Sequence, residues 1–467
     1  MNSTLTITGL LLMMMFTSAC VTQKRYADPL ATMTDRMASH GVRRVAAQQA
    51  YDELGFSPAH VKALHRLVWD RGYPHAQRKY AIDRLIEHDE AAFHEILQRR
   101  IVLLHNWDTL NYVFDWGVKR QWPNFIRTVV RSYARPAHGM RDDERSEHTT
   151  IERINPDKTV QQSVFEVFAD PDDSVSHKQQ VAAWTLLSRI STQDELLRMI
   201  SAAPATTPLA VDLKAAATEL SVLPRNREGV LWLAYLRGAE QAGFWQSAAA
   251  QLSRLSPAQR RGMQLRHLPV LLAMGDDAMS RTRTAMFASV DTMVSPSEHH
   301  YKGATYDGAP ADYPQRLAHW RDELTWPDLA VMWILCKALR DRDVVASLFA
   351  QAGRDLTDTS TEHGGIIDVH NGRFLAIAYP PFMRTSDRKF IPSDKMVRHM
   401  YTALAHYHFH AQEQRNSDYA GPGRGDRKLA NRLNPNCVVF TFIDANRLNV
   451  DYYQPGGAVI DLGTVYR

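Results

Sequence analysis

The sequence predicts a multidomain protein in which a long all-α region is followed by a smaller α/β domain. The chain has 467 residues, which is enough for more than one hydrophobic core. Apolar residues recur at helical spacing from about residue 56 to residue 350, and at about Thr357 the pattern changes to short β-rich runs. We therefore divide the chain into an export signal (1–20), a polar tether (21–50), a helical region (51–354) and an α/β domain (355–467).

Composition and charge exclude several classes of protein. Lys and Arg total 55 and Asp and Glu total 51, a net charge of +4, and no basic run is present. We therefore expect no nucleic-acid partner, because binding to phosphate backbones needs clustered cations. The three cysteines, Cys20, Cys336 and Cys437, are too few for a disulfide scaffold or a Cys-rich zinc module.

The amino terminus has the pattern of an export signal. The apolar run Leu5–Phe16 is shorter than the roughly 20 residues that span a bilayer. Small residues then precede Cys20, which resembles the lipobox of bacterial lipoproteins, although Thr17 replaces the usual Leu and no Lys or Arg precedes the run. The resemblance implies lipidation of Cys20, a lipid anchor in the membrane and a location in the bacterial cell envelope, facing the periplasm or the exterior. The alternatives are a non-lipidated signal cut near Ala19 or a short amino-terminal anchor.

The apolar pattern of residues 51–354 predicts many amphipathic helices joined by short loops. Val61, Leu64 and Val68 share one helical face, and Thr192 with Glu195 has the pattern of a capping box. Such helices predict stacked pairs that resemble HEAT-like repeats. An irregular helical bundle fits equally well, because no constant repeat period is found. In either case the region offers a surface for a protein partner.

One stretch interrupts the helical pattern. Residues Ser295–Pro314 are rich in Gly, Pro and Tyr, and the segment is longer than an ordinary connection. We expect a surface loop that lies over a neighbouring cleft.

The α/β domain contains the residues with metal-binding chemistry. His406, His408 and His410 alternate in the run HYHFH. In an extended chain residues i and i+2 project to one face, so two of these imidazoles can bind one ion. Asp426 follows a Gly/Pro turn at a helix start and offers an oxygen ligand. Three protein ligands with an open fourth position are typical of catalytic zinc. The pair His406 and His408 is an alternative to His408 and His410.

The order of these residues resembles the JAMM/MPN family of zinc metalloproteases and isopeptidases. The family motif is a glutamate, then H-x-H, then P-S-x-x-D. This chain has Glu362, then His408 and His410, then the run Pro422–Asp426. The resemblance covers residues 355–467. It implies that His408, His410 and Asp426 bind Zn²⁺, that Glu362 is the general acid/base, and that the enzyme hydrolyses an amide bond of a peptide or protein substrate.

Three positions depart from that motif. Gly423 stands where the family has serine, Ala411 replaces the usual proline, and the interval from His410 to Asp426 is longer than the common form. The family serine stabilises the oxyanion, and the loss of one such donor costs about 10²–10³ in rate. The rival reading is therefore a membrane-tethered helical scaffold or binding protein whose terminal domain has lost catalysis.

Overall fold

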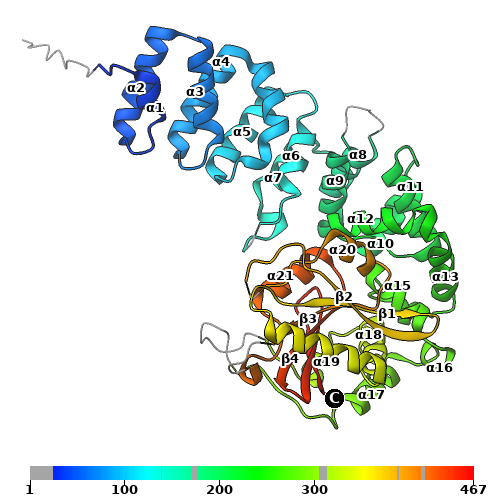
Figure 1. The fold of residues 1–467 in the computed structure, drawn as a ribbon. Helices are drawn as coiled ribbons and strands as arrows, with labels where there is room; N and C mark the ends of the chain where they lie inside the picture. The colour runs from blue at the N-terminus through cyan, green and yellow to red at the C-terminus, as the bar shows by residue number, and fades with distance from the viewer. Residues whose placement is uncertain (1–24, 138, 171–175, 304–312, 387–388, 412–415) are drawn as a thin grey trace, which may run out of the picture. The chain divides into compact units, whose positions relative to one another are not determined.

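The computed structural model describes residues 25–137, 139–170, 176–303, 313–386, 389–411 and 416–467. The predicted export signal and Cys20 lie outside these described residues, so both stay predictions. The chain divides into two compact units, Met1–Ser132 and Tyr133–Arg467, which we describe separately. The predicted fold class is confirmed: a largely helical region precedes a carboxy-terminal six-stranded mixed sheet (Figure 1).

The first unit is built from helices that pack on their neighbours in sequence. Its helices are α1 (Pro29–Thr34), α2 (His40–Leu54), α3 (Pro58–Trp69), α4 (His75–Arg100), α5 (Trp107–Lys119) and α6 (Phe125–Tyr133), which extends one residue into the second unit. Helices α1 and α2 pack together, as do α3 and α4 (Figure 1). Ser57 caps α3 by accepting a hydrogen bond from the His60 amide, and Leu64 and Val68 of the predicted stripe are fully buried.

The prediction of a polar tether over residues 21–50 is wrong from Pro29 onward. Asp28 caps α1 and Ser39 caps α2, so the chain is helical there. The buried face of α2 consists mainly of small residues, among them Ala46 and Ala50. Alanine forms helices well but gives a weak apolar stripe, and for this reason the segment looked polar in the sequence.

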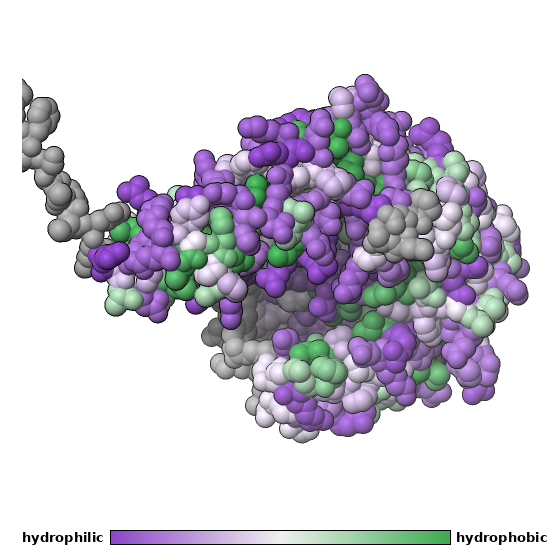
Figure 2. Space-filling view, turned by 90° about the horizontal axis from the view of Figure 1, so that it is seen from above, coloured by the Kyte–Doolittle hydropathy of each residue, from purple (hydrophilic) through white to green (hydrophobic). Residues whose placement is uncertain are grey.

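The second unit continues as helices before the sheet begins. These are α7 (Ser146–Ile154), α8 (Val160–Ala169), α9 (His177–Ile190), α10 (Gln193–Ala202), α11 (Pro208–Ala215), α12 (Arg227–Leu236), α13 (Ala242–Ser253), α14 (Pro257–Arg260), α15 (Leu268–Ala273), α16 (Asp276–Met279), α17 (Arg283–Val294), α18 (Trp326–Ala338) and α19 (Arg342–Thr357). The predicted capping box at α10 is confirmed, since Thr192 and Glu195 exchange backbone-to-side-chain hydrogen bonds of 2.7 and 3.3 Å. Hydrophilic residues dominate the face shown in Figure 2, as expected for the outer sides of amphipathic helices. Within the described ranges, no helix is both long and apolar enough to cross a bilayer.

The predicted β-rich runs form one mixed sheet. Its strands are β1 (Gly364–His370), β2 (Arg373–Tyr379), β3 (Ala405–His410), β4 (Cys437–Asp444), β5 (Arg447–Tyr453) and β6 (Val459–Tyr466), in the order β2-β1-β3-β4-β5-β6. Strands β3 and β4 pair in parallel, and the other neighbours are antiparallel. The connection between β3 and β4 contains α21 (Arg424–Leu433), which is the crossover that a parallel pair requires.

The sheet is covered on both faces. We call the side onto which His406, His408 and His410 project the histidine face. Helices α20 (Asp394–Met400) and α21 pack on it, and Met396 and Leu433 join one apolar cluster with Ile366 of β1. On the other face, the Tyr407 hydroxyl donates a hydrogen bond to Gln351 of α19. The candidate ligands therefore lie between the sheet and the helix that carries Asp426.

The sheet and the preceding helices share a buried polar core. Arg266 donates to Asp328 at 2.8 Å, with side chains only 2% and 5% exposed. Asn436 lies just before β4, and its side-chain Nδ2 donates to the backbone carbonyls of Arg266 and Leu404, each at 2.9 Å. Buried charges need such partners, because an unpaired buried charge is strongly destabilising. Residues before and after position 355 thus complete one core within the second unit.

Candidate metal centre

The position of β3 in the sheet fixes the direction of the histidines. Strand β3 lies between β1 and β4, with Gly364 opposite His408 and Thr441 opposite His410. His408 is buried, with 2% of its surface exposed, and His410 is half-buried. The prediction that alternate histidines share one face is confirmed.

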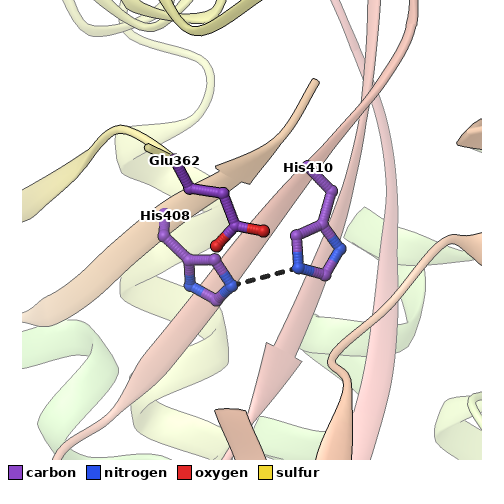
Figure 3. A group of neighbouring side chains, drawn as sticks. All are labelled: Glu362, His408 and His410. Carbon is purple, nitrogen blue, oxygen red and sulfur yellow. Dashed lines mark hydrogen bonds between the residues drawn. The ribbon is translucent and has the colours of Figure 1, made fainter. Parts of the chain in front are cut away.

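Three candidate ligands meet at the distances expected around one ion. The Nε2 atoms of His408 and His410 are 3.2 Å apart (Figure 3). Asp426 places Oδ1 3.4 Å from His408 Nε2 and Oδ2 3.5 Å from His410 Nε2. Two ligands held about 2.0–2.1 Å from a tetrahedral ion are about 3.3 Å apart. The separation of the two imidazoles matches that value, and each imidazole lies at about that distance from a different oxygen of Asp426, so these residues can surround a bound metal ion.

Glu362 reaches the same place from the neighbouring strand. It lies two residues before Gly364 and therefore projects onto the histidine face. Possible ligand atoms of Glu362, His408 and His410 all lie within 4.8 Å of one another, and Figure 3 shows the carboxylate directed into the space between the rings. Glu362 is buried, with 6% of its surface exposed. It can thus reach one shared ion directly or through one water molecule.

Asp426 is held as a charged carboxylate. Burial alone would raise its pKa, but the attraction and hydrogen bonds of His408 and His410 outweigh burial, so its pKa lies well below the usual value. Its Oδ2 also accepts a hydrogen bond of 2.7 Å from the Gly423 amide at the start of α21. A helix N-terminus favours negative charge. The turn before α21 therefore sets the position and charge of this ligand.

His406 does not join the cluster. Burial, with a smaller effect of His408, lowers its pKa to about 3, so the ring is neutral. Both of its ring nitrogens are buried without a hydrogen-bond partner in the part of the chain that the structure describes. Its ring centroid lies 5.7 Å from that of His408. The group that converges with Glu362 contains His408 and His410, which disfavours the alternative pair.

Cys336 and Cys437 contribute no reactive thiol to the site. Both are free and buried. Burial raises the pKa of Cys336 to about 12, and it raises that of Cys437 as well. A thiol needs a lowered pKa to act as a nucleophile at neutral pH.

Sequence reasoning missed the residues that hold the turn before Asp426. Tyr313 and Gln315 donate hydrogen bonds to carbonyls of that turn, those of Pro422 at 2.6 Å and Ala420 at 3.2 Å. Their one signal in the sequence was the unusual loop Ser295–Pro314, which contains Tyr313 and ends just before Gln315. The described part of that loop contacts the turn and the sheet: Lys302 donates to the Pro422 carbonyl, and the His300 carbonyl accepts from Asn449 of β5. Residues 304–312 lie outside the described part, and the predicted cleft stays a prediction.

Comparisons with protein-family models, with curated proteins and with solved structures find no match to this chain. The chemistry of the site is therefore inferred from its own residues. Two imidazoles and one ionised carboxylate make a ligand set suited to a divalent metal ion. A second buried carboxylate beside them adds a group that can accept a proton.

Proposed function

We propose that these residues form a JAMM-type zinc centre that hydrolyses a peptide or isopeptide amide bond. His408, His410 and Asp426 would hold the ion, and Glu362 would be the general acid/base. The observation that carries the proposal is the set of three ligand separations between 3.2 and 3.5 Å, with the Glu362 carboxylate beside them. The ligand order along the chain, with both histidines on one strand and the aspartate at a helix start, supports the family resemblance.

The roles of the residues follow from their chemistry. When bound, zinc lowers the pKa of water and polarises a carbonyl group. Glu362 accepts the proton of the attacking water and returns it to the leaving amine, so one carboxylate serves both halves of the reaction. The low pKa of Asp426 keeps that ligand charged at neutral pH.

Elemental analysis of the full-length protein, purified without added metal, tests the proposal most directly. We expect about one zinc ion per chain. If the protein carries no zinc and binds none when Zn²⁺ is supplied, the proposed function is wrong.

The rival function, a scaffold without catalysis, is favoured by one residue, Gly423. The backbone there has φ −78° and ψ 177°, which any residue adopts. A Cβ atom at this position would meet one neighbour, Asp426 Oδ2, at an ordinary 3.4 Å. Serine therefore fits, and its hydroxyl would restore the donor that the motif lacks.

We expect Gly423→Ser to raise kcat by up to ~10²-fold, because one oxyanion donor is worth about that much. Gly423→Ala fills the same space without a hydroxyl and serves as the control. The measurement is the rate of peptide cleavage at equal zinc content. An equal rate for the serine and alanine variants would contradict the donor role, whereas activity of the serine variant alone would support the scaffold reading of the natural chain.

Location and partners are proposals that rest on the sequence. The lipobox-like pattern before Cys20 supports an envelope protein anchored to the membrane by lipid. The helical region supports a protein partner, and the hydrolytic site supports a peptide or protein substrate. The absence of a basic run supports a protein with no nucleic-acid partner.

A further inference from the structure

The turn that leads to Asp426 is bound by a distant segment of the chain. We call residues Ser297–Gly303 and Tyr313–Gln315 the strap. Tyr313 Oη donates to the Pro422 carbonyl at 2.6 Å, and Lys302 Nζ donates to the same carbonyl at 3.3 Å. Gln315 Nε2 donates to the Ala420 carbonyl at 3.2 Å. Three strap side chains therefore hold two carbonyls of the turn, those of Ala420 and Pro422.

The strap and the turn are closely fitted at Gly421. Its φ is +105°, in the region where glycine is favoured. A Cβ atom there would lie 2.7 Å from Gln315 Nε2 and 3.1 Å from Tyr313 Oη. Both the backbone conformation and the close approach exclude a side chain, so the turn can take only a narrow range of positions under the strap.

The sheet fixes the strap in turn. Gln315 is 4% exposed, and its Nε2 also donates to Asp451 Oδ1 in β5 at 2.8 Å. Its Oε1 accepts from the Lys302 amide at 2.6 Å, and its backbone carbonyl accepts from the Asp461 amide in β6 at 2.8 Å. Gln315 therefore links strands β5 and β6 with the strap and the turn.

A displacement of the turn would reach the metal ligand directly. The Gly423 amide, next to the bound Pro422 carbonyl, donates to Asp426 Oδ2 at 2.7 Å. Arg427, in the first turn of α21, places its guanidinium carbon 4.6 Å from the Tyr313 ring centroid. Residues that hydrogen-bond a metal ligand and orient it, without contacting the ion, typically lower metal affinity ~10–100-fold when they are removed.

We propose that Tyr313 and Gln315 are positioning residues of the metal centre, which act on Asp426 through the turn Ala420–Gly423. The inference rests on the proposed function. It implies that the centre is completed by residues that precede position 355, so a fragment holding only the β-rich part of the chain would bind metal poorly.

The test uses the full chain with Tyr313→Phe and Gln315→Ala. Zinc affinity is measured by competition with a chromophoric chelator, and coordination geometry by the visible spectrum after loading with Co²⁺. Tyr313→Phe keeps the ring and removes one hydrogen bond. We expect both variants to bind zinc ~10–100-fold more weakly than the natural protein and to change the Co²⁺ spectrum.

Tyr466→Phe is the matched control. Its hydroxyl donates to Glu298 Oε2 at 2.8 Å, so the bond involves the strap but not the turn. We expect it to bind zinc with natural affinity. If Gln315→Ala fails to fold, Tyr313→Phe decides alone.

The outcomes separate this inference from the proposed function. If the natural protein binds no zinc, the proposed function fails and the inference fails with it. If the natural protein binds one zinc and the folded variants match its affinity and Co²⁺ spectrum, the positioning role is wrong and the proposed function stands. A lower melting temperature with unchanged zinc affinity would likewise reduce the strap to a structural role.

Discussion

Replacing His408 with alanine is expected to remove the metal ion from the protein. Its Nε2 lies 3.2 Å from His410 Nε2 and 3.4 Å from Asp426 Oδ1, so it forms two of the three contacts between ligands. Loss of a direct ligand should exceed the ~10–100-fold loss of affinity seen when a supporting residue is removed. Elemental analysis should therefore find far less than one zinc per chain.

The control for this variant is His370→Ala. His370 ends β1 in the same sheet and is exposed, away from the ligand group. We expect that variant to retain its zinc. A His408→Ala protein that still holds one zinc per chain would show that the ion is bound elsewhere, and the assignment of the centre would then be wrong.

Replacing Glu362 with glutamine should abolish most of the activity and leave the metal in place. Glutamine has nearly the same shape but cannot accept the proton of the attacking water. General acid/base catalysis contributes about 10²–10⁴-fold, and we expect kcat to fall by that amount. Cleavage of a mixed peptide library, followed by mass spectrometry, measures the rate.

Zinc content separates the two roles open to Glu362. If it acts as general acid/base, the glutamine variant keeps about one zinc per chain. If it is instead a direct ligand, zinc is lost together with activity. Glu323→Gln, at an exposed position outside the site, is the control for the charge change and should behave as the natural protein does.

Local patterns predicted the parts of the fold that local interactions determine. The run from Cys437 shows the β-rich composition of a buried strand, and it forms β4. The spacing of His408 and His410 predicted a shared face because alternation in a strand follows from covalent geometry. Helix α2 was missed because small residues such as Ala46 bury an interface without giving a strong apolar signal.

The candidate site was predictable only in part, because some of its contacts have no sequence signature. Glu362 meets the histidines through the register of β1 on β3, which a sequence does not display without a family resemblance. The strap binds backbone carbonyls of Ala420 and Pro422, and every residue type presents the same carbonyl. The hydrogen bonds between Arg266 and the sheet have no sequence signature either, because its partners lie far away along the chain.

The bonds made by Gln315 also bear on the order in which the protein folds. Its partners Ala420 and Asp451 follow it by 105 and 136 residues. Contacts of such long sequence separation form late in folding, because the intervening chain loses conformational entropy before these contacts stabilise it. During synthesis the strap leaves the ribosome well before the turn and β5 do. We therefore expect metal uptake to follow, rather than guide, the assembly of the sheet, so the partly synthesised chain would not yet hold the ion.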